Sequence, residues 1–85
     1  MPLFYFNIYN DDITPDDSGI DLASPEAARE RAILEARELA MESIKMHGHL
    51  ILDHHIDVLD THGELVVSIS FEDAIDIRPT LERRS

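Results

Sequence analysis

A single long helix between strand-like segments is the feature that most limits the folds open to this chain. Ser24 is a favourable N-cap, Pro25 suits the first helical position, and Gly48 is a residue at which a helix can end. At 100° per residue, the apolar side chains of this segment gather on one arc, which predicts a helix with one buried, alanine-rich face. That arc consists of Ala28, Ala32, Ile33, Ala36, Leu39, Ala40, Ile44 and Met46.

Strand-like alternation precedes and follows the helix. In the aromatic segment from Leu3 to Tyr9, every second side chain is expected to point into the core. After the helix, a hairpin is expected to turn at residues 60–63. The side chains predicted to point inward are Phe4, Phe6, Ile8, Ile56, Val58, Leu65, Val67, Ile69 and Phe71, with Val66, Ser68 and Ser70 outward.

These elements predict an α+β domain with the order β-α-β-β. We expect a three-stranded antiparallel sheet in the order 1-3-2, with the helix packed on one face. The third strand has the longest inward apolar row, and a helical crossover would leave the first two strands parallel, with room between them. Residues 1–77 are expected to form one domain and residues 78–85 a flexible tail, with Ile75 and Ile77 compatible with an extension of the last strand.

Composition excludes several classes of function. The 85 residues include 18 acidic and 7 basic residues, a net charge of −11, which repels nucleic-acid phosphates unless basic side chains cluster. There is no cysteine, so disulfides, thiol catalysis and thiolate metal sites are ruled out. No apolar run reaches the roughly 20 residues that span a bilayer. We therefore expect a cytoplasmic protein with no membrane partner, no direct nucleic-acid partner and no cofactor.

The order and spacing of short motifs carry a resemblance to a known family. The motifs are the aromatic opening at residues 1–7, the acidic turn 16–19, the start of the helix at 25–28, and the segments 58–60 and 63–64 before the strand that ends at Phe71. Over residues 1–72 the chain resembles a family of short bacterial proteins classed as a domain of unknown function. That resemblance implies a compact domain in a bacterial cytoplasm and carries no activity, cofactor or catalytic residue.

The loop before the helix holds the densest set of oxygen ligands, and two interpretations of it remain open. Calcium or magnesium binding requires several oxygens converging on one point. The run lacks the alternating spacing and closing glutamate of an EF-hand, which favours a solvated acidic turn with local hydrogen bonds. The candidate ligands are Asp11, Asp12, Asp16, Asp17 and Asp21.

The five histidines are expected to lie on the surface around one end of the domain. They are His47, His49, His54, His55 and His62. A transition-metal site needs three or four ligands within bonding distance. At best, His49 and one of the pair His54 and His55 could converge with Asp53.

Because no catalytic constellation is visible along the chain, we expect a non-enzymatic protein that binds other proteins and forms a homodimer. Two surfaces are available for this role. One is the sheet face that the helix leaves open, with Leu3, Tyr5, Tyr9, Leu59 and Val66 as candidates; the other is the pair Leu34 and Met41 on the charged side of the helix. Alternatives are divalent-cation binding and an acidic, antitoxin-like protein that binds a basic partner.

Overall fold

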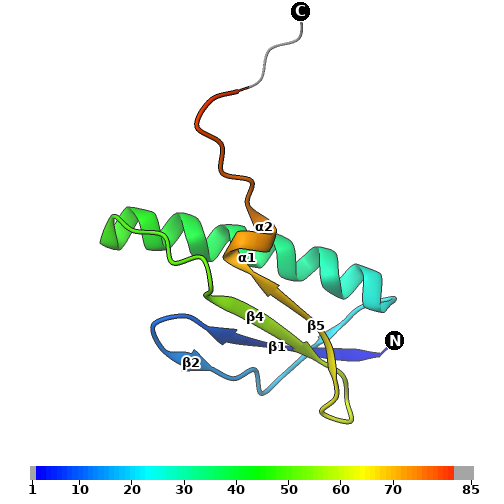
Figure 1. The fold of residues 1–85 in the computed structure, drawn as a ribbon. Helices are drawn as coiled ribbons and strands as arrows, with labels where there is room; N and C mark the ends of the chain where they lie inside the picture. The colour runs from blue at the N-terminus through cyan, green and yellow to red at the C-terminus, as the bar shows by residue number, and fades with distance from the viewer. Residues whose placement is uncertain (1, 82–85) are drawn as a thin grey trace, which may run out of the picture.

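A computed structural model describes residues 2–81 of the chain, and within them one sheet is covered on one face by a long helix (Figure 1). The α+β class is confirmed. The elements are β1 (Leu3–Tyr9), β2 (Ile13–Thr14), β3 (Ile20–Asp21), α1 (Pro25–His47), β4 (His55–Leu59), β5 (Leu65–Ser70) and α2 (Phe71–Ala74).

The strand order differs from the prediction. Within residues 2–81 the sheet has five strands in the order β2-β1-β4-β5, and β3 also pairs with β1. The predicted order 1-3-2 is therefore wrong: β1 is paired along both edges, and the last strand, β5, lies outside β4 rather than between β1 and β4. All pairs are antiparallel, including the pair of β1 and β4 that we expected to be separated and parallel.

The acidic segment before α1 explains this difference. It runs back along β1 as two short strands, so that Leu22 N–H donates to the carbonyl of Pro2 at 3.1 Å. Helix α1 therefore begins beside the start of β1 and ends beyond the end of β1. Strand β4 then starts opposite Tyr9 and can only run antiparallel to β1. The chain thus returns along β1 in an extended conformation before α1 begins, in place of the helical crossover that we expected between two parallel strands.

Helix α1 forms because its caps and its spacing agree. The Ser24 hydroxyl accepts the N–H of Ala27 at 3.1 Å, and Gly48 closes the helix with φ of +69°. The residues of α1 that face the sheet most closely recur every four positions and are at most 1% exposed: Ala28, Ala32, Ala36 and Ala40. Methyl side chains let the helix backbone approach the sheet closely.

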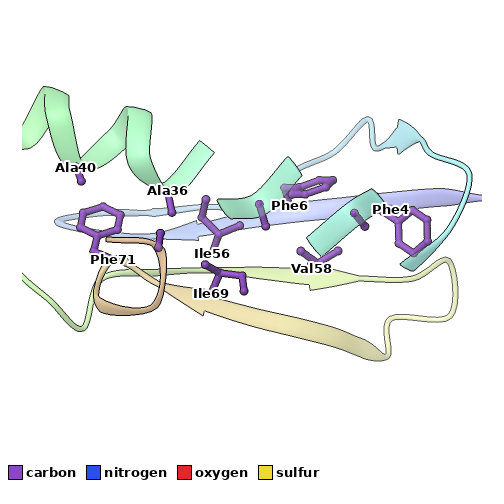
Figure 2. Packing of buried hydrophobic residues seen from close by; sticks show 11 residues of the cluster. Phe4, Phe6, Ala36, Ala40, Ile56, Val58, Ile69 and Phe71 are labelled. Atoms are coloured by element: carbon purple, nitrogen blue, oxygen red, sulfur yellow. The ribbon is translucent and has the colours of Figure 1, made fainter. Parts of the chain in front are cut away.

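The core lies between this alanine row and one face of the sheet (Figure 2). Ala36 and Ala40 point from α1 toward Phe71 and Ile56 in Figure 2. Phe71, Ile56 and Val58 are the largest side chains that are fully buried. The core is therefore small in volume and depends on a few large residues from the strands.

The C-terminal end of α1 is more exposed than predicted. Ile44 and Met46 belong to the predicted buried arc, but they are 51% and 69% exposed. Figure 1 shows the last turns of α1 extending beyond the strands. The prediction was wrong there because helical periodicity gives a residue's direction and not how far the sheet extends beneath it.

Strand β5 departs from its predicted alternation at its start. Val58 pairs with Val67, but Leu59 pairs with Leu65, so a bulge leaves Val66 without a direct partner. Leu65, which we expected to point inward, is consequently 59% exposed, while Val66 is half-buried and packs against the core.

The strand also ends earlier than its alternation suggested. Phe71 begins the one-turn helix α2 instead of continuing β5, because Ser70 and Asp73 form a reciprocal capping box. Ile75 and Ile77 do not extend the sheet, and the chain after α2 runs away from the domain (Figure 1). Of the predicted tail, residues 82–85 lie outside the described part of the chain.

Candidate functional site

The sheet face opposite α1 is left open by both helices, which pack on the other side (Figure 1). Strand pairing arranges its side chains in rows across the sheet. One row is Tyr5–Leu59–Leu65, the next is Asn7–Asp57–Ser68, and the last is Ile13–Tyr9–His55–Ser70. The face therefore alternates between a mainly apolar row, a polar row and an aromatic row.

Four of the five predicted sheet-face residues lie on this open face. Leu3 pairs with Asp21 at its margin, and Tyr5, Tyr9 and Leu59 lie in the rows above, all partly buried. The fifth, Val66, is drawn toward the core at the bulge. Alternation along the strands was sufficient to predict the first four residues. The bulge in β5 explains why the fifth, Val66, does not lie on the open face.

The aromatic row has a defined geometry. The rings of Tyr9 and His55 stack with centroids 4.8 Å apart and planes 11° from parallel. His55 Nε2 lies 3.7 Å from Asp57 Oδ1, and His55 Nδ1 lies 3.0 Å from the backbone carbonyl of Asp53. This surface presents an aromatic stack beside a carboxylate.

The loop aspartates have separate structural roles. Strand β2 pairs with Ile8 and Tyr9, and β3 with Leu3 and Phe4, so the middle of β1 has no strand partner on that edge. Asp16 fills this gap: its Oδ2 accepts the N–H of Phe6 at 3.1 Å.

Further hydrogen bonds hold Asp16 in place. Its Oδ1 accepts the N–H groups of Ser18 and Gly19 at 3.0 and 3.1 Å, and its own N–H donates to Asn7 Oδ1 at 2.9 Å. Partial burial opposes ionisation of Asp16, but the N–H groups of Phe6, Gly19 and Ser18 outweigh it and lower the pKa of this carboxyl.

Gly19 is required in the same loop. Its φ is +75°, and a Cβ at this position would lie 3.0 Å from the ring of Tyr5. The loop therefore packs against the open face next to Tyr5, and only glycine combines the positive φ with that close approach.

The candidate cation ligands do not converge. Asp16 is committed to backbone N–H groups, Asp21 lies in β3, and Asp11 and Asp12 lie in the turn between β1 and β2. In the described residues 2–81, no group of three or more His, Asp or Glu side chains has a geometry that could hold a metal ion. The prediction of calcium or magnesium binding at this loop has no support in this geometry.

Two histidines meet one carboxylate that the sequence did not connect with them. His47 Nε2 and His54 Nε2 lie 3.8 and 3.9 Å from the two carboxylate oxygens of Asp11. These groups line a small cavity of about 50 Å³ at the end of α1, into which Phe71 also packs. The ring of His54 contacts Phe71 edge-on, and its buried Nδ1 has no hydrogen-bond partner among residues 2–81.

The other histidines lie apart from this cluster. His49 stacks on His47 with centroids 5.3 Å apart, and His62 lies in the hairpin turn between β4 and β5. The suggested convergence on Asp53 is replaced by one on Asp11, because the turn between β1 and β2 brings Asp11 to the end of α1. Only knowledge of that turn could have revealed it.

The second predicted surface, on α1, is larger than expected. Leu34 and Met41 are 57% and 61% exposed, on the side of α1 opposite the alanine row. Ile44, three residues after Met41, flanks this pair and is 51% exposed, so that three exposed apolar side chains follow one another along the helix. We call these three residues the outer stripe.

Each outer edge of the sheet is either partly capped or short. Phe71 N–H donates toward β4, to the carbonyl of His54, at 2.8 Å. Since successive N–H groups of a strand point to opposite sides, the N–H of Ser70 points to the free edge of β5, where Asp73 Oδ2 accepts it at 3.1 Å. At the other edge, β2 and β3 have two residues each. Strand addition at these edges is therefore disfavoured.

Comparison with known proteins gives one match. A family model described as a domain of unknown function (DUF6894) matches residues 3–72, which run from the first residue of β1 into α2. No curated protein and no solved structure matches the chain. Within residues 2–81, every helix is too short or too polar to cross a membrane.

Proposed function

The chain belongs to the DUF6894 family, a domain of unknown function, and we propose that it acts as a small, non-enzymatic protein–protein interaction module that forms a homodimer through α1. The observation that carries this proposal is the outer stripe. Leu34, Met41 and Ile44 each expose more than half of their surface. Leu34 and Met41 lie on the side of α1 opposite the alanine row, and Ile44 flanks them near the C-terminal end of the helix. Exposed apolar side chains aligned on one helix face are typical of helix–helix interfaces.

Charge supports self-association through α1 rather than through the sheet. Within residues 2–81, the Lys and Arg side chains are Arg29, Arg31, Arg37 and Lys45, all on α1, and Arg78 after α2. The helix also carries five glutamates, so its own charge is close to zero. Two copies can therefore approach through α1 without the like-charge repulsion that a sheet-to-sheet contact would create.

An antiparallel pairing of two α1 helices also matches opposite charges. If Leu34 lies opposite Met41 of the partner subunit, Glu30 comes opposite Lys45 of the partner subunit. Apolar side chains at the centre flanked by complementary charges define register in paired helices.

The size of the helix is sufficient for a stable contact. Standard interfaces bury about 800 Å² on each partner, an eighth of the 6216 Å² surface of this domain. At about 1.5 Å per residue, the 23 residues of α1 provide a long contact surface. The small core adds a reason for association, because little apolar area is buried within one subunit.

Light scattering after size-exclusion chromatography tests this proposal. Across micromolar concentrations, the wild-type chain should have twice its monomer mass of 9.7 kDa. Leu34→Glu should shift the mass to that of the monomer while the circular dichroism spectrum is unchanged, because a carboxylate would be buried in the apolar centre of the interface.

Leu65→Glu is the matched control, because Leu65 is as exposed as Leu34 but lies on β5. This variant should remain dimeric. A wild-type chain that is monomeric across the range, or a dimer that survives Leu34→Glu and Met41→Glu, would reject the proposed interface.

A further inference from the structure

We propose that the open face of the sheet binds an arginine- or lysine-rich segment of a partner protein. This binding goes beyond homodimerisation, and it uses the opposite side of the molecule from the outer stripe. The central residues are Tyr9, His55 and Asp57, with the apolar row Tyr5–Leu59–Leu65 beside them.

Separation of charge between the two layers is the first observation. Residues 1–24 and 48–77, which form the sheet, its loops and α2, contain twelve Asp and Glu residues and neither Lys nor Arg. Asp21 and Asp57 lie on the open face, and the loops at its rim carry further carboxylates, among them Asp12, Asp17 and Glu64. A surface of one sign attracts a segment of the opposite sign and speeds its association.

The chemistry of the face is the second observation. The stacked rings of Tyr9 and His55 lie beside the carboxylate of Asp57, whose side chain is 24% exposed. An aromatic ring next to a carboxylate suits a guanidinium or ammonium group, which can lie against the ring and donate hydrogen bonds to the carboxylate. The neighbouring apolar row can contact the aliphatic part of the same side chains.

Other occupants fit this face less well. A second copy would bring two acidic layers together, and nucleic acid would bring phosphates onto the same carboxylates. Asp73 caps one end of the β5 edge, and the strands of the other edge have two residues each, so the segment would lie across the face instead of adding a strand.

Fluorescence anisotropy with a labelled arginine–serine repeat peptide tests the proposal. The wild-type protein should bind this probe and should not bind a glutamate–serine repeat. Asp57→Asn should weaken binding about tenfold, which corresponds to about 1.4 kcal/mol. Tyr9→Leu should weaken it about two- to fivefold, because the aromatic face for the cation is lost.

Glu42→Gln is the matched control, since it removes the same charge from an exposed position on α1, away from the open face. It should change the affinity less than about twofold if contact rather than net charge decides binding. Equal losses in Asp57→Asn and Glu42→Gln, or no binding of the arginine peptide, would overturn the proposal. Thermal melts of each variant establish that it is folded.

Two further measurements separate this inference from the proposed dimer. The Leu34→Glu variant should bind the peptide as tightly as wild type, whether light scattering finds this variant to be a monomer or a dimer. Tyr9→Leu should leave the mass in light scattering unchanged. A loss of mass in Tyr9→Leu would instead show that the open face is an interface between copies of the chain, and would contradict a basic partner as its occupant.

Discussion

Asp16 substitutes for a missing strand partner. Between β2 and β3 the edge of β1 would be unpaired, and the Asp16 carboxylate accepts the N–H of Phe6 there while also closing its own turn onto Ser18 and Gly19. Hydrogen bonds to a charged acceptor are stronger than neutral ones. This single side chain therefore joins the loop to the middle of the sheet.

Asp16→Asn should destabilise the domain by about 1–2 kcal/mol. The amide keeps one oxygen for the turn but directs an NH₂ group at the N–H of Phe6, so two donors face each other. Urea denaturation measures the change. Asp17→Asn is the control, because Asp17 is exposed and lies next to Asp16 in the same acidic turn; a loss of equal size there would contradict the role given to Asp16.

The unfolding free energies of wild type and Asp16→Asn should also depend differently on pH. The pKa of Asp16 in the folded protein is below its ordinary value of 3.8, so its ionised form stabilises the fold. The difference in unfolding free energy between wild type and Asp16→Asn should be constant above the ordinary pKa. It should shrink as the pH falls through the lower, folded pKa, where wild type becomes protonated. A difference that grows on acidification would contradict this assignment.

Helix α2 ends β5, and one pair of residues caps the last N–H on the free edge of this strand. The Ser70 hydroxyl accepts the N–H of Asp73 at 3.0 Å, and Asp73 returns a carboxylate to the N–H of Ser70. The backbone N–H of Ser70, its hydroxyl and the charge of Arg29 lower the pKa of Asp73. Arg37 of α1 then donates to the carbonyl of Ala74 at 2.7 Å, so α2 is held at both ends.

Ser70→Ala should cost about 1 kcal/mol, since it removes an N-cap hydroxyl. It should also increase hydrogen exchange at Asp73, whose N–H loses the Ser70 hydroxyl as its acceptor, while the N–H of Phe71 keeps its bond to the carbonyl of His54. Exchange measured by NMR distinguishes the two sites. Ser68→Ala, on the same strand but without a capping role, should leave stability and exchange at Asp73 unchanged, and parallel effects in the two variants would reject the cap as the cause.

At the scale of elements, local patterns predicted α1 and the core-facing side of β1 and β4 well. Ser24, Gly48 and the alanine spacing are sufficient for the helix, since caps and periodicity act within one segment. The strand order failed because it depends on where the chain travels between elements. Residues 10–21 have the composition of a loop, yet they pair with β1 through only two residues in each strand.

The candidate surfaces were predictable to the same extent. The positions of Tyr5 and Tyr9 on the open face were predictable from strand alternation, and that of Leu34 from helical spacing. Both patterns show which way a side chain points without knowledge of the tertiary structure. The meeting of His47 and His54 at Asp11, and the row that places Tyr9 beside His55, depend on turns and register. Register is set by pairing between distant segments, which no local pattern contains.

At the scale of the whole molecule, a nearly neutral helix covers a strongly acidic sheet. The shortest dimension of the structure is 16 Å, as expected for one helix on one sheet. Carboxylates of the sheet layer therefore lie near one another with few cations between them, and their mutual repulsion opposes folding.

Potassium chloride should consequently raise the melting temperature. The screening length falls from about 30 Å at 0.01 M to about 3 Å at 1 M salt, which weakens repulsion between exposed carboxylates. Neutralising one sheet-layer charge with Asp12→Asn should reduce this rise more than Glu38→Gln on α1 does. Differential scanning calorimetry measures both. A melting temperature that falls with salt would show that attractive pairs dominate.

The unequal charge of the two layers also gives the molecule a permanent electric dipole moment. Its centre of negative charge is displaced from its centre of mass toward the strands, because residues 1–24 and 48–77 hold most of the carboxylates. In the field of a positively charged body the molecule would rotate before any contact, and the strands would arrive first. Two such molecules in solution would turn those same sides away from each other, which leaves the helices to meet.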